Sequence, residues 1–138
     1  MTRPLLAHVD LCVTDLDRSL PFYTELLERV GGTTDSTVIG ERGETIHYLS
    51  GTDLRGSVGL RLRQSDAHAV PYDRYAVGVH HIALRAGSRA EVDAVAQWLR
   101  ERDATIESGP AEYDYSPGYY AVFFYDPDGV KLEVVHRP

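Results

Sequence analysis

The chain has 138 residues, of which 43% are hydrophobic and 25% are charged, with a formal net charge of −7. This length suits one soluble globular unit, and the single cysteine, Cys12, excludes an internal disulfide and is typical of a reducing compartment. The acidic charge disfavours nucleic acid as a partner, and no apolar run approaches the roughly 20 residues of a membrane-spanning helix. We therefore expect a cytoplasmic protein that binds neither nucleic acid nor membranes.

A weak internal repeat divides the sequence into two halves. The segment 8–13, HVDLCV, has a counterpart in 81–86, HIALRA, and each is followed by an amphipathic stretch. An alternating segment near 58–62 recurs at 130–134. The repeat predicts a single domain, 1–138, made of two β-α-β-β-β modules at 1–64 and 79–138, with a linker at 65–78.

The first module is expected to contain one strong strand, one helix and three weaker strands. Residues 5–13 alternate, so His8 and Asp10 share one face of the strand while apolar residues take the other. We expect the helix to begin between Asp17 and Ser19 and to end at the pair 31–32, Gly-Gly. Its predicted apolar stripe is Leu16, Leu20, Tyr23 and Leu27. Weaker strands are expected near 38–39, 45–49 and 57–63.

The second module repeats this order. Residues 79–86 predict a strand, and Ser88 with Glu91 predicts the capping box of a helix. The core-facing residues of that helix are expected to be Val92, Val95, Ala96 and Leu99. A short strand at 105–106, a loop and a strand at 119–125 follow. The sequence DPDG at 126–129 then predicts a turn into the last strand, which begins at Val130.

Two histidines and one carboxylate are candidates for a common site. His8 lies on the strand face away from the helix, and the repeat places His81 at the same position of the second module. Alternation along 130–135 places Glu133 on the corresponding face. Two imidazoles and one carboxylate are typical ligands of Zn²⁺, Mn²⁺, Fe²⁺, Co²⁺ or Ni²⁺. The alternative is that these are polar residues with ordinary hydrogen bonds. By the same alternation His80 points to the opposite face, and we interpret it as structural or interfacial.

Three stretches together resemble the vicinal oxygen chelate superfamily, which includes glyoxalase I, extradiol dioxygenases and bleomycin-binding proteins. They are HVDL at 8–11 with DLDRSLPFYTELL at 15–27, VHHIAL at 79–84, and FFYDPDGVKLE at 123–133. The resemblance implies an α+β fold in which paired β-α-β-β-β modules form a cupped mixed sheet around one divalent metal ion, usually in a homodimer. It also implies that His8, His81 and Glu133 are the metal ligands, with Glu133 taking part in catalysis.

The sequence departs from two branches of this superfamily. Glyoxalase I enzymes typically have a second glutamate in the first module, where this chain has Arg61, and a cation there suits an anionic group of a substrate. The fosfomycin enzymes usually have a threonine two residues after the first histidine, where this chain has Asp10.

Four further residues are candidates for the site. The family pattern puts His47 on the cavity face, where it could act as an acid or base, and Asp10 could orient a ligand or move a proton. Tyr119 and Phe123 have the parity to face the cavity and bind substrate, in a region rich in tyrosine. The alternative is that these side chains are polar residues at the rim or pack against the edge of the sheet.

The sequence and the resemblance together predict a metal-dependent enzyme of glyoxalase-like lyase or isomerase type, acting on a small oxygenated substrate. One alternative is an extradiol-type ring-cleaving dioxygenase, which would use Fe²⁺ or Mn²⁺ with the same ligands. Another is a non-catalytic protein that binds a small molecule such as an antibiotic.

Overall fold

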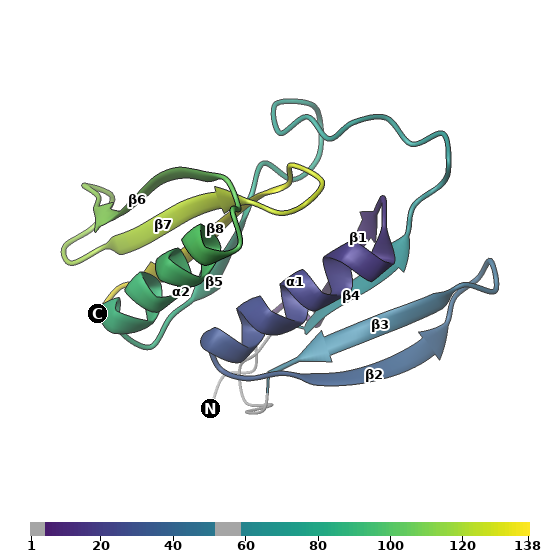
Figure 1. Ribbon diagram of the computed structural model, residues 1–138, viewed down its shortest axis with the longest axis horizontal. Helices are drawn as coiled ribbons and strands as arrows, with labels where there is room; N and C mark the ends of the chain where they lie inside the picture. Colours follow the sequence, from purple (N-terminus) through teal and green to yellow (C-terminus); the bar gives the residue numbers. More distant parts are fainter. Residues whose placement is uncertain (1–4, 52–58) are drawn as a thin grey trace. The chain divides into compact units, whose positions relative to one another are not determined.

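The computed structural model describes residues 5–51 and 59–138. The chain divides into two compact units, residues 1–70 and 71–138. Each unit contains one helix and one four-stranded mixed sheet, as Figure 1 shows. This is the predicted α+β class, with the order β-α-β-β-β in both units.

The first unit contains β1 (His8–Val13), α1 (Leu16–Arg29), β2 (Thr34–Ile39), β3 (Thr45–Ser50) and β4 (Gly59–Gln64). The strand order in its sheet is β1-β4-β3-β2. The strands β1 and β4 are parallel, whereas the β4–β3 and β3–β2 pairs are antiparallel. All residues of β2 are exposed, and residues 57–58 of the predicted fourth strand lie outside the described residues.

The helix α1 begins at Leu16, before the predicted start between Asp17 and Ser19. Asp15 is its N-cap, because the Asp15 carboxylate accepts a hydrogen bond from the Asp17 amide at 3.0 Å. The predicted stripe is also displaced around the helix axis, since Leu16 and Leu27 are only partly buried. The buried residues are Ser19, Phe22, Tyr23 and Leu26. The apolar side of this helix is wide, and the two aromatic residues Phe22 and Tyr23 lie at the centre of its buried face.

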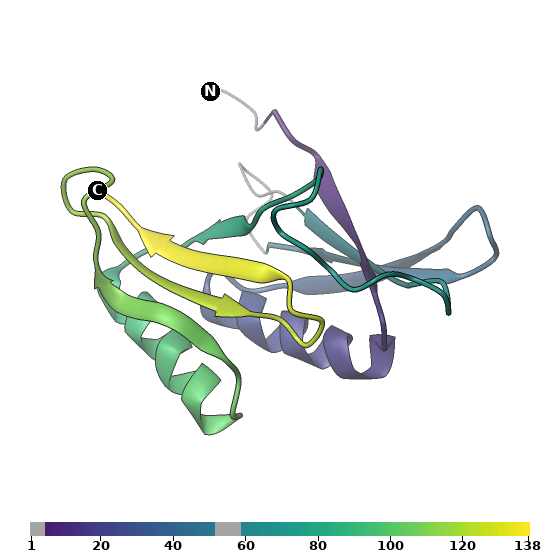
Figure 2. The same ribbon diagram turned by 90° about the horizontal axis from the view of Figure 1, so that it is seen from above.

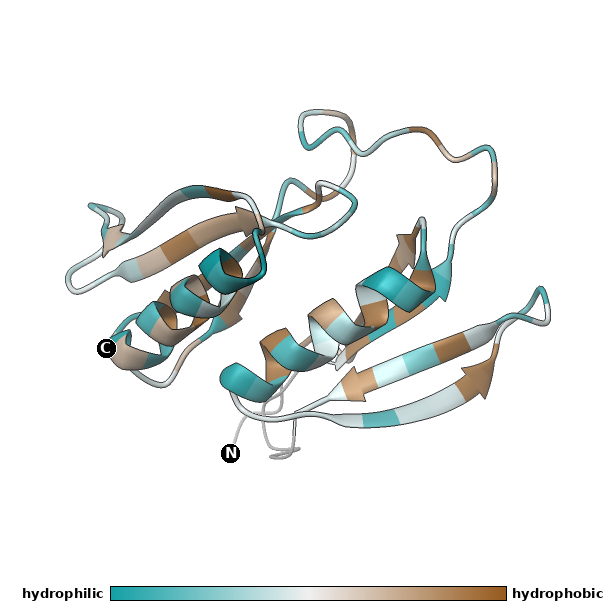
Figure 3. Ribbon diagram, viewed as in Figure 1, coloured by the Kyte–Doolittle hydropathy of each residue, from teal (hydrophilic) through white to brown (hydrophobic). Residues whose placement is uncertain are grey.

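The second unit contains β5 (Ile82–Arg85), α2 (Arg89–Glu101), β6 (Ile106–Glu112), β7 (Tyr120–Tyr125) and β8 (Lys131–His136). Its strand order, β5-β8-β7-β6, matches that of the first unit. Figure 2 shows α2 along one face of this sheet, and Figure 3 shows apolar residues along β7. The predicted core positions of α2 are confirmed as buried, and Trp98 joins them. The face under α2 carries Val122, Phe124, Leu132 and Val134, all fully buried.

Two strands of this unit differ in length from the prediction. The strand β6 runs to Glu112 although its sequence, IESGPAE, does not resemble a strand. Bulges interrupt its pairing with β7, and Gly109 adopts a φ of 86° with the Ala121 carbonyl only 2.4 Å from where a Cβ would lie. The strand β5 begins at Ile82 rather than at residue 79, so the two preceding histidines lie before the strand.

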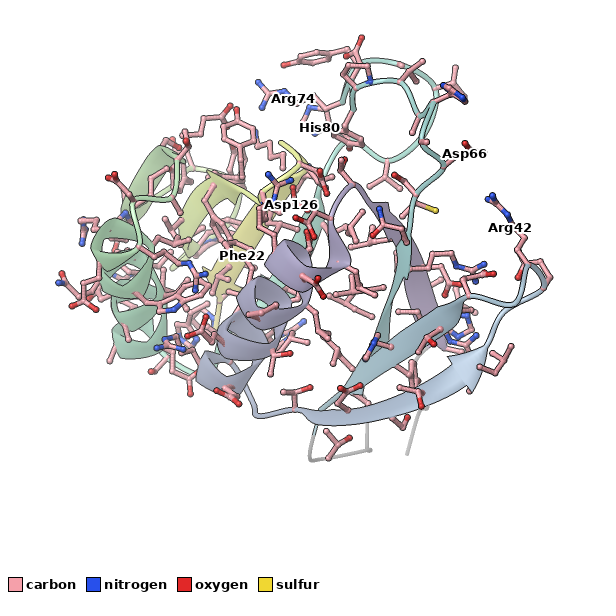
Figure 4. All side chains as sticks on the ribbon, turned by 45° about the vertical axis from the view of Figure 1, so that its right-hand side comes forward. Phe22, Arg42, Asp66, Arg74, His80 and Asp126 are labelled. Atoms are coloured by element: carbon pink, nitrogen blue, oxygen red, sulfur yellow. The ribbon has the colours of Figure 1, made fainter. Side chains whose placement is uncertain are left out.

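The segment 71–78, predicted as linker, is fastened to the second unit. The Tyr72 hydroxyl donates to the carbonyl groups of Val79 and His80, and the Arg74 guanidinium donates to Glu107 at 2.7 Å. Figure 4 shows the side chains of Arg74 and His80 close together at this loop. Within the described ranges 5–51 and 59–138, no helix has the length and apolar character needed to cross a membrane.

Candidate functional site

The sheet face away from α2 in the second unit carries the candidate site residues of that unit. Register places Phe123 opposite Glu133, and Ala83 opposite Glu133 on the other side. Glu133 is only 2% exposed, although it lies on the face that the helix does not cover. The same face carries a buried apolar cluster of Ala121, Phe123 and Val135, and Phe123 stands directly opposite Glu133. The site is therefore a partly apolar surface with a buried carboxylate within it.

Both oxygens of the Glu133 carboxylate have a partner. His81 Nε2 lies 3.2 Å from Oε1, and the Tyr119 hydroxyl donates a hydrogen bond to Oε2. Burial and this contact with Glu133 raise the pKa of Tyr119 well above its ordinary value, so the phenol is protonated at neutral pH. The structure thus brings together His81, Glu133 and Tyr119, which the sequence places on three separate segments.

His80 lies on the other side of the His81 ring. The two Nδ1 atoms are 2.8 Å apart, and the two rings are nearly perpendicular at 81°. Burial, followed by the neighbouring His81, lowers the pKa of His80, which keeps its ring neutral at neutral pH. Our interpretation from alternation put His80 on the opposite face, away from the site. It failed because residues 80 and 81 precede β5, where strand alternation does not apply.

Aromatic rings extend from this histidine–carboxylate pair into the loop before β7. Phe123 lies edge-on to His81 with ring centroids 6.3 Å apart, and Tyr113 lies edge-on to Phe123 at 5.2 Å. Tyr115 stacks on Tyr113 at 5.7 Å, is 68% exposed and contacts Tyr119. A cavity of about 720 Å³ is lined by residues 112–119 of this loop. The face therefore offers flat apolar surface beside the buried carboxylate.

A second polar cluster lies on the same face of the sheet, nearer the turn between β7 and β8, where Tyr125 stands opposite Lys131. Glu107 accepts hydrogen bonds from Arg74 and from the Tyr125 hydroxyl, and it pairs with Lys131 Nζ at 2.6 Å. These three partners, Lys131 first, lower the pKa of Glu107 to about 2. Lys131 also lies over the Phe123 ring at 5.0 Å. The cluster joins the loop 71–78 to β6, β7 and β8, and no motif in the sequence predicts it.

The first unit has its own histidine–carboxylate pair. His8 Nε2 lies 3.3 Å from Asp10 Oδ1, and Asp10 Oδ2 accepts from the Arg63 guanidinium at 2.6 Å. Arg63 also binds Glu41 and Glu44. Its hydrogen bonds to Asp10 and then to Glu41 raise the pKa of Arg63, and a backbone hydrogen bond followed by the Arg63 contact lowers the pKa of Glu41. In both units, then, an imidazole Nε2 lies beside one carboxylate oxygen while a fixed donor binds the other.

The carboxylate comes from a different strand in each unit. Asp10 on β1 stands opposite Arg61 on β4, as Ala83 on β5 stands opposite Glu133 on β8. The acidic residue thus lies on the first strand of the first unit, β1, but on the last strand of the second unit, β8. Arg61 occupies the position of Glu133, as the repeat predicted.

Arg61 has limited pairing in its own unit. Its guanidinium lies over the Tyr48 ring at 5.2 Å, and its Nε is 3.9 Å from Asp10. That Nε atom is shielded from solvent and has no hydrogen-bond partner among the residues the structure describes. Tyr48 also covers Gly59, where a Cβ would meet the Tyr48 ring at 2.4 Å.

His47 does not share this face. It stands opposite Leu62, which belongs to the buried core, while Tyr48 stands opposite Arg61. The His47 ring lies 3.3 Å from the Asp35 carboxylate on β2. The family pattern predicted His47 on the cavity face, but the register puts Tyr48 opposite Arg61 there, and in a strand a difference of one residue changes the face. A catalytic role for His47 stays a prediction.

A catalytic divalent metal ion is typically bound by three protein side chains. No cluster of three or more His, Cys, Asp or Glu side chains with metal-binding geometry occurs within residues 5–51 and 59–138. His81 Nε2 and Glu133 Oε1 nevertheless converge at 3.2 Å, and a nitrogen–oxygen pair of this kind is typical of such metals. The chemistry of the second unit's pair therefore fits two of the ligands of a metal site.

Sequence comparison places the chain in a known family. Residues 5–134 match the profile of the Glyoxalase/Bleomycin resistance protein/Dioxygenase superfamily, and the chain belongs to that superfamily. The YqjT protein of Bacillus subtilis (strain 168) is 26% identical over 129 residues, which cover 93% of this chain and 95% of YqjT.

Solved structures share the fold. A candidate glyoxalase from Bacillus halodurans has a TM-score of 0.76 and is 28% identical, with 96% of each chain covered. The fosfomycin resistance protein FosX from Listeria monocytogenes, in complex with Mn(II) and sulfate, has a TM-score of 0.61. It is 16% identical, and the match covers 96% of this chain and 92% of FosX. These neighbours establish the glyoxalase-like α+β fold.

Proposed function

We propose that this protein is a divalent-metal-dependent enzyme of glyoxalase-like lyase or isomerase type, acting on a small oxygenated substrate. The observation that carries the proposal is the buried Glu133 carboxylate beside His81 Nε2. Removing a carboxylate from water is costly, yet this face of the sheet buries Glu133. In this buried position its oxygens can act as metal ligands. His8, His81 and Glu133 are the proposed protein ligands. We also expect a homodimer.

A divalent ion held by these residues would supply Lewis-acid stabilisation of an oxyanion on the substrate. The residues of the second unit have defined roles beside it. Glu133 directs its Oε1 at His81, while the Tyr119 phenol holds a proton next to the site. The apolar side chains of Phe123 and Ala121 exclude water from the carboxylate. In the first unit Arg61 is proposed to bind an anionic group, and Asp10 to orient His8 or move a proton.

A ring-cleaving dioxygenase is the second candidate function, favoured by the aromatic surface of Phe123, Tyr113 and Tyr115 beside the pair. Such a surface suits a flat ring. The two enzyme classes differ in their need for oxygen. The dioxygenase requires Fe²⁺ or Mn²⁺ and consumes O₂ with a catechol, whereas the lyase or isomerase works anaerobically with Ni²⁺, Co²⁺ or Zn²⁺.

The proposal is tested by the metal content of protein purified without a chelator or a metal-affinity tag. We expect about one divalent ion per chain in the wild type, by the ligand count of such sites, and loss of the ion in His81→Ala and in Glu133→Gln. His136→Ala is the matched control, because His136 ends the strand of Glu133 and its Nδ1 contacts the Ala86 carbonyl at 3.4 Å rather than a proposed ligand. Protein that binds no metal even after reconstitution would contradict an enzyme of this kind and leave a small-molecule binding protein.

A further inference from the structure

The two proposed metal ligands of the second unit each contact a polar neighbour on the side away from the other ligand. His80 contacts the Nδ1 side of the His81 ring, away from Glu133. Tyr119 contacts the Glu133 oxygen that His81 does not touch. The four side chains therefore form one continuous chain of contacts, in the order His80, His81, Glu133, Tyr119.

We propose that His80 and Tyr119 are positioning residues that hold His81 and Glu133 in the orientation needed to bind the metal. This inference rests on the proposed function. Side chains that bind the far side of a ligand fix its tautomer and direction, and their loss typically weakens metal binding by about 10- to 100-fold.

The contact with His80 fixes the metal-binding tautomer of His81 when His80 Nδ1 is the acceptor. A neutral imidazole carries one proton, so Nε2 can bind a metal only when that proton is on Nδ1. The Nδ1 atom then needs an acceptor, and His80 Nδ1 lies 2.8 Å away. Without His80, the proton on His81 Nδ1 loses this partner, and the ring is free to rotate about its side-chain bonds.

The contact with Tyr119 selects the oxygen that Glu133 presents. A carboxylate can bind a metal through either oxygen or through both. The Tyr119 hydroxyl occupies Oε2, which leaves Oε1 directed at His81 Nε2. Tyr119 itself is held by Tyr115 and by the apolar cluster around Phe123, so its hydroxyl is not free to follow a moving carboxylate.

The neighbouring Tyr120 provides a matched control. Its hydroxyl also donates to a carboxylate, that of Asp93 on α2, at 2.5 Å. Tyr119→Phe and Tyr120→Phe therefore each remove one hydroxyl and one contact with a carboxylate, but only the first touches a proposed ligand. For His80→Ala the control is His68→Ala, because His68 is an exposed histidine in the first unit.

The test is a titration of the full-length protein with Co²⁺, followed by its visible absorption spectrum, which reports ligand geometry. We expect Tyr119→Phe and His80→Ala each to weaken Co²⁺ binding by about 10- to 100-fold and to change the spectrum. Tyr120→Phe and His68→Ala should bind within about twofold of the wild type. Circular dichroism of each variant checks that it is folded, and if Tyr119→Phe fails to fold, His80→Ala decides the proposal.

Different outcomes would contradict the proposed function and the positioning role. A wild-type protein that binds no Co²⁺, or binding that survives His81→Ala, contradicts the proposed function itself. Wild-type protein that binds Co²⁺ and loses it in His81→Ala, together with unchanged affinity and spectrum in Tyr119→Phe and His80→Ala, overturns only the positioning role.

Discussion

Glu107 shows how individual charged residues stabilise the second unit. Its carboxylate contacts Arg74, Tyr125 and Lys131, which come from the loop 71–78 and from two strands. Because the pKa of Glu107 falls from an ordinary value of 4.5 to about 2 on folding, the native state favours the ionised form. The stabilisation is therefore complete above pH 4.5 and is lost as the pH falls toward 2.

We predict that Glu107→Gln lowers the free energy of unfolding by about 1 kcal/mol at pH 7, a modest value because the side chain is 27% exposed. The difference from the wild type should shrink as the pH falls from 4.5 toward 2, since the wild type then loses the same charge. Urea unfolding at several pH values measures this. Glu112→Gln, which removes a more exposed carboxylate paired with Arg89, serves as the control. An equal loss of stability at pH 2 and pH 7 would refute the electrostatic account.

The helix α2 is the element whose beginning is defined most clearly by local contacts. The Ser88 hydroxyl accepts a hydrogen bond from the Glu91 amide at 3.2 Å, and the Glu91 carboxylate accepts one from the Gly87 amide at 2.6 Å. These contacts satisfy amide groups that have no partner within the helix. The buried side of α2 then packs on the sheet face that lies opposite the candidate site.

We predict that Ser88→Ala destabilises the protein by about 1 kcal/mol, whereas Ser88→Asp, which keeps an acceptor at the N-cap, remains close to the wild type. The midpoint of urea unfolding measures both effects, and an unchanged slope shows that the same surface is exposed. If the alanine and aspartate variants are equally stable, the cap does not stabilise α2.

At the scale of the whole molecule, each unit contains a proposed metal-binding histidine that lies beside a carboxylate. His8 with Asp10 belongs to the first unit, and His81 with Glu133 belongs to the second. The family resemblance assigns ligands to both units. If one metal ion binds side chains of both units, removing a ligand from either unit should remove the stabilisation that the metal provides.

We predict that His8→Ala weakens metal binding as strongly as His81→Ala does. Free metal at about 100 times its dissociation constant should stabilise the wild type by about 2.7 kcal/mol, and this gain should disappear in either variant. Thermal unfolding with and without Co²⁺ measures it, with His68→Ala as the control. Full stabilisation of His8→Ala would place all protein ligands in the second unit.

Local sequence patterns were enough to predict the repeat, the α+β class, the start of α2 and the alternation that puts Glu133 and Phe123 on one face. These features depend on local periodicity and on capping residues, which a sequence displays directly. The tertiary structure alone decided the contacts of His80, Tyr119 and Glu107, and the face on which His47 lies. Those contacts join segments far apart in the chain or depend on where a strand begins and on its register. A shift of one residue in either reverses the direction of a side chain.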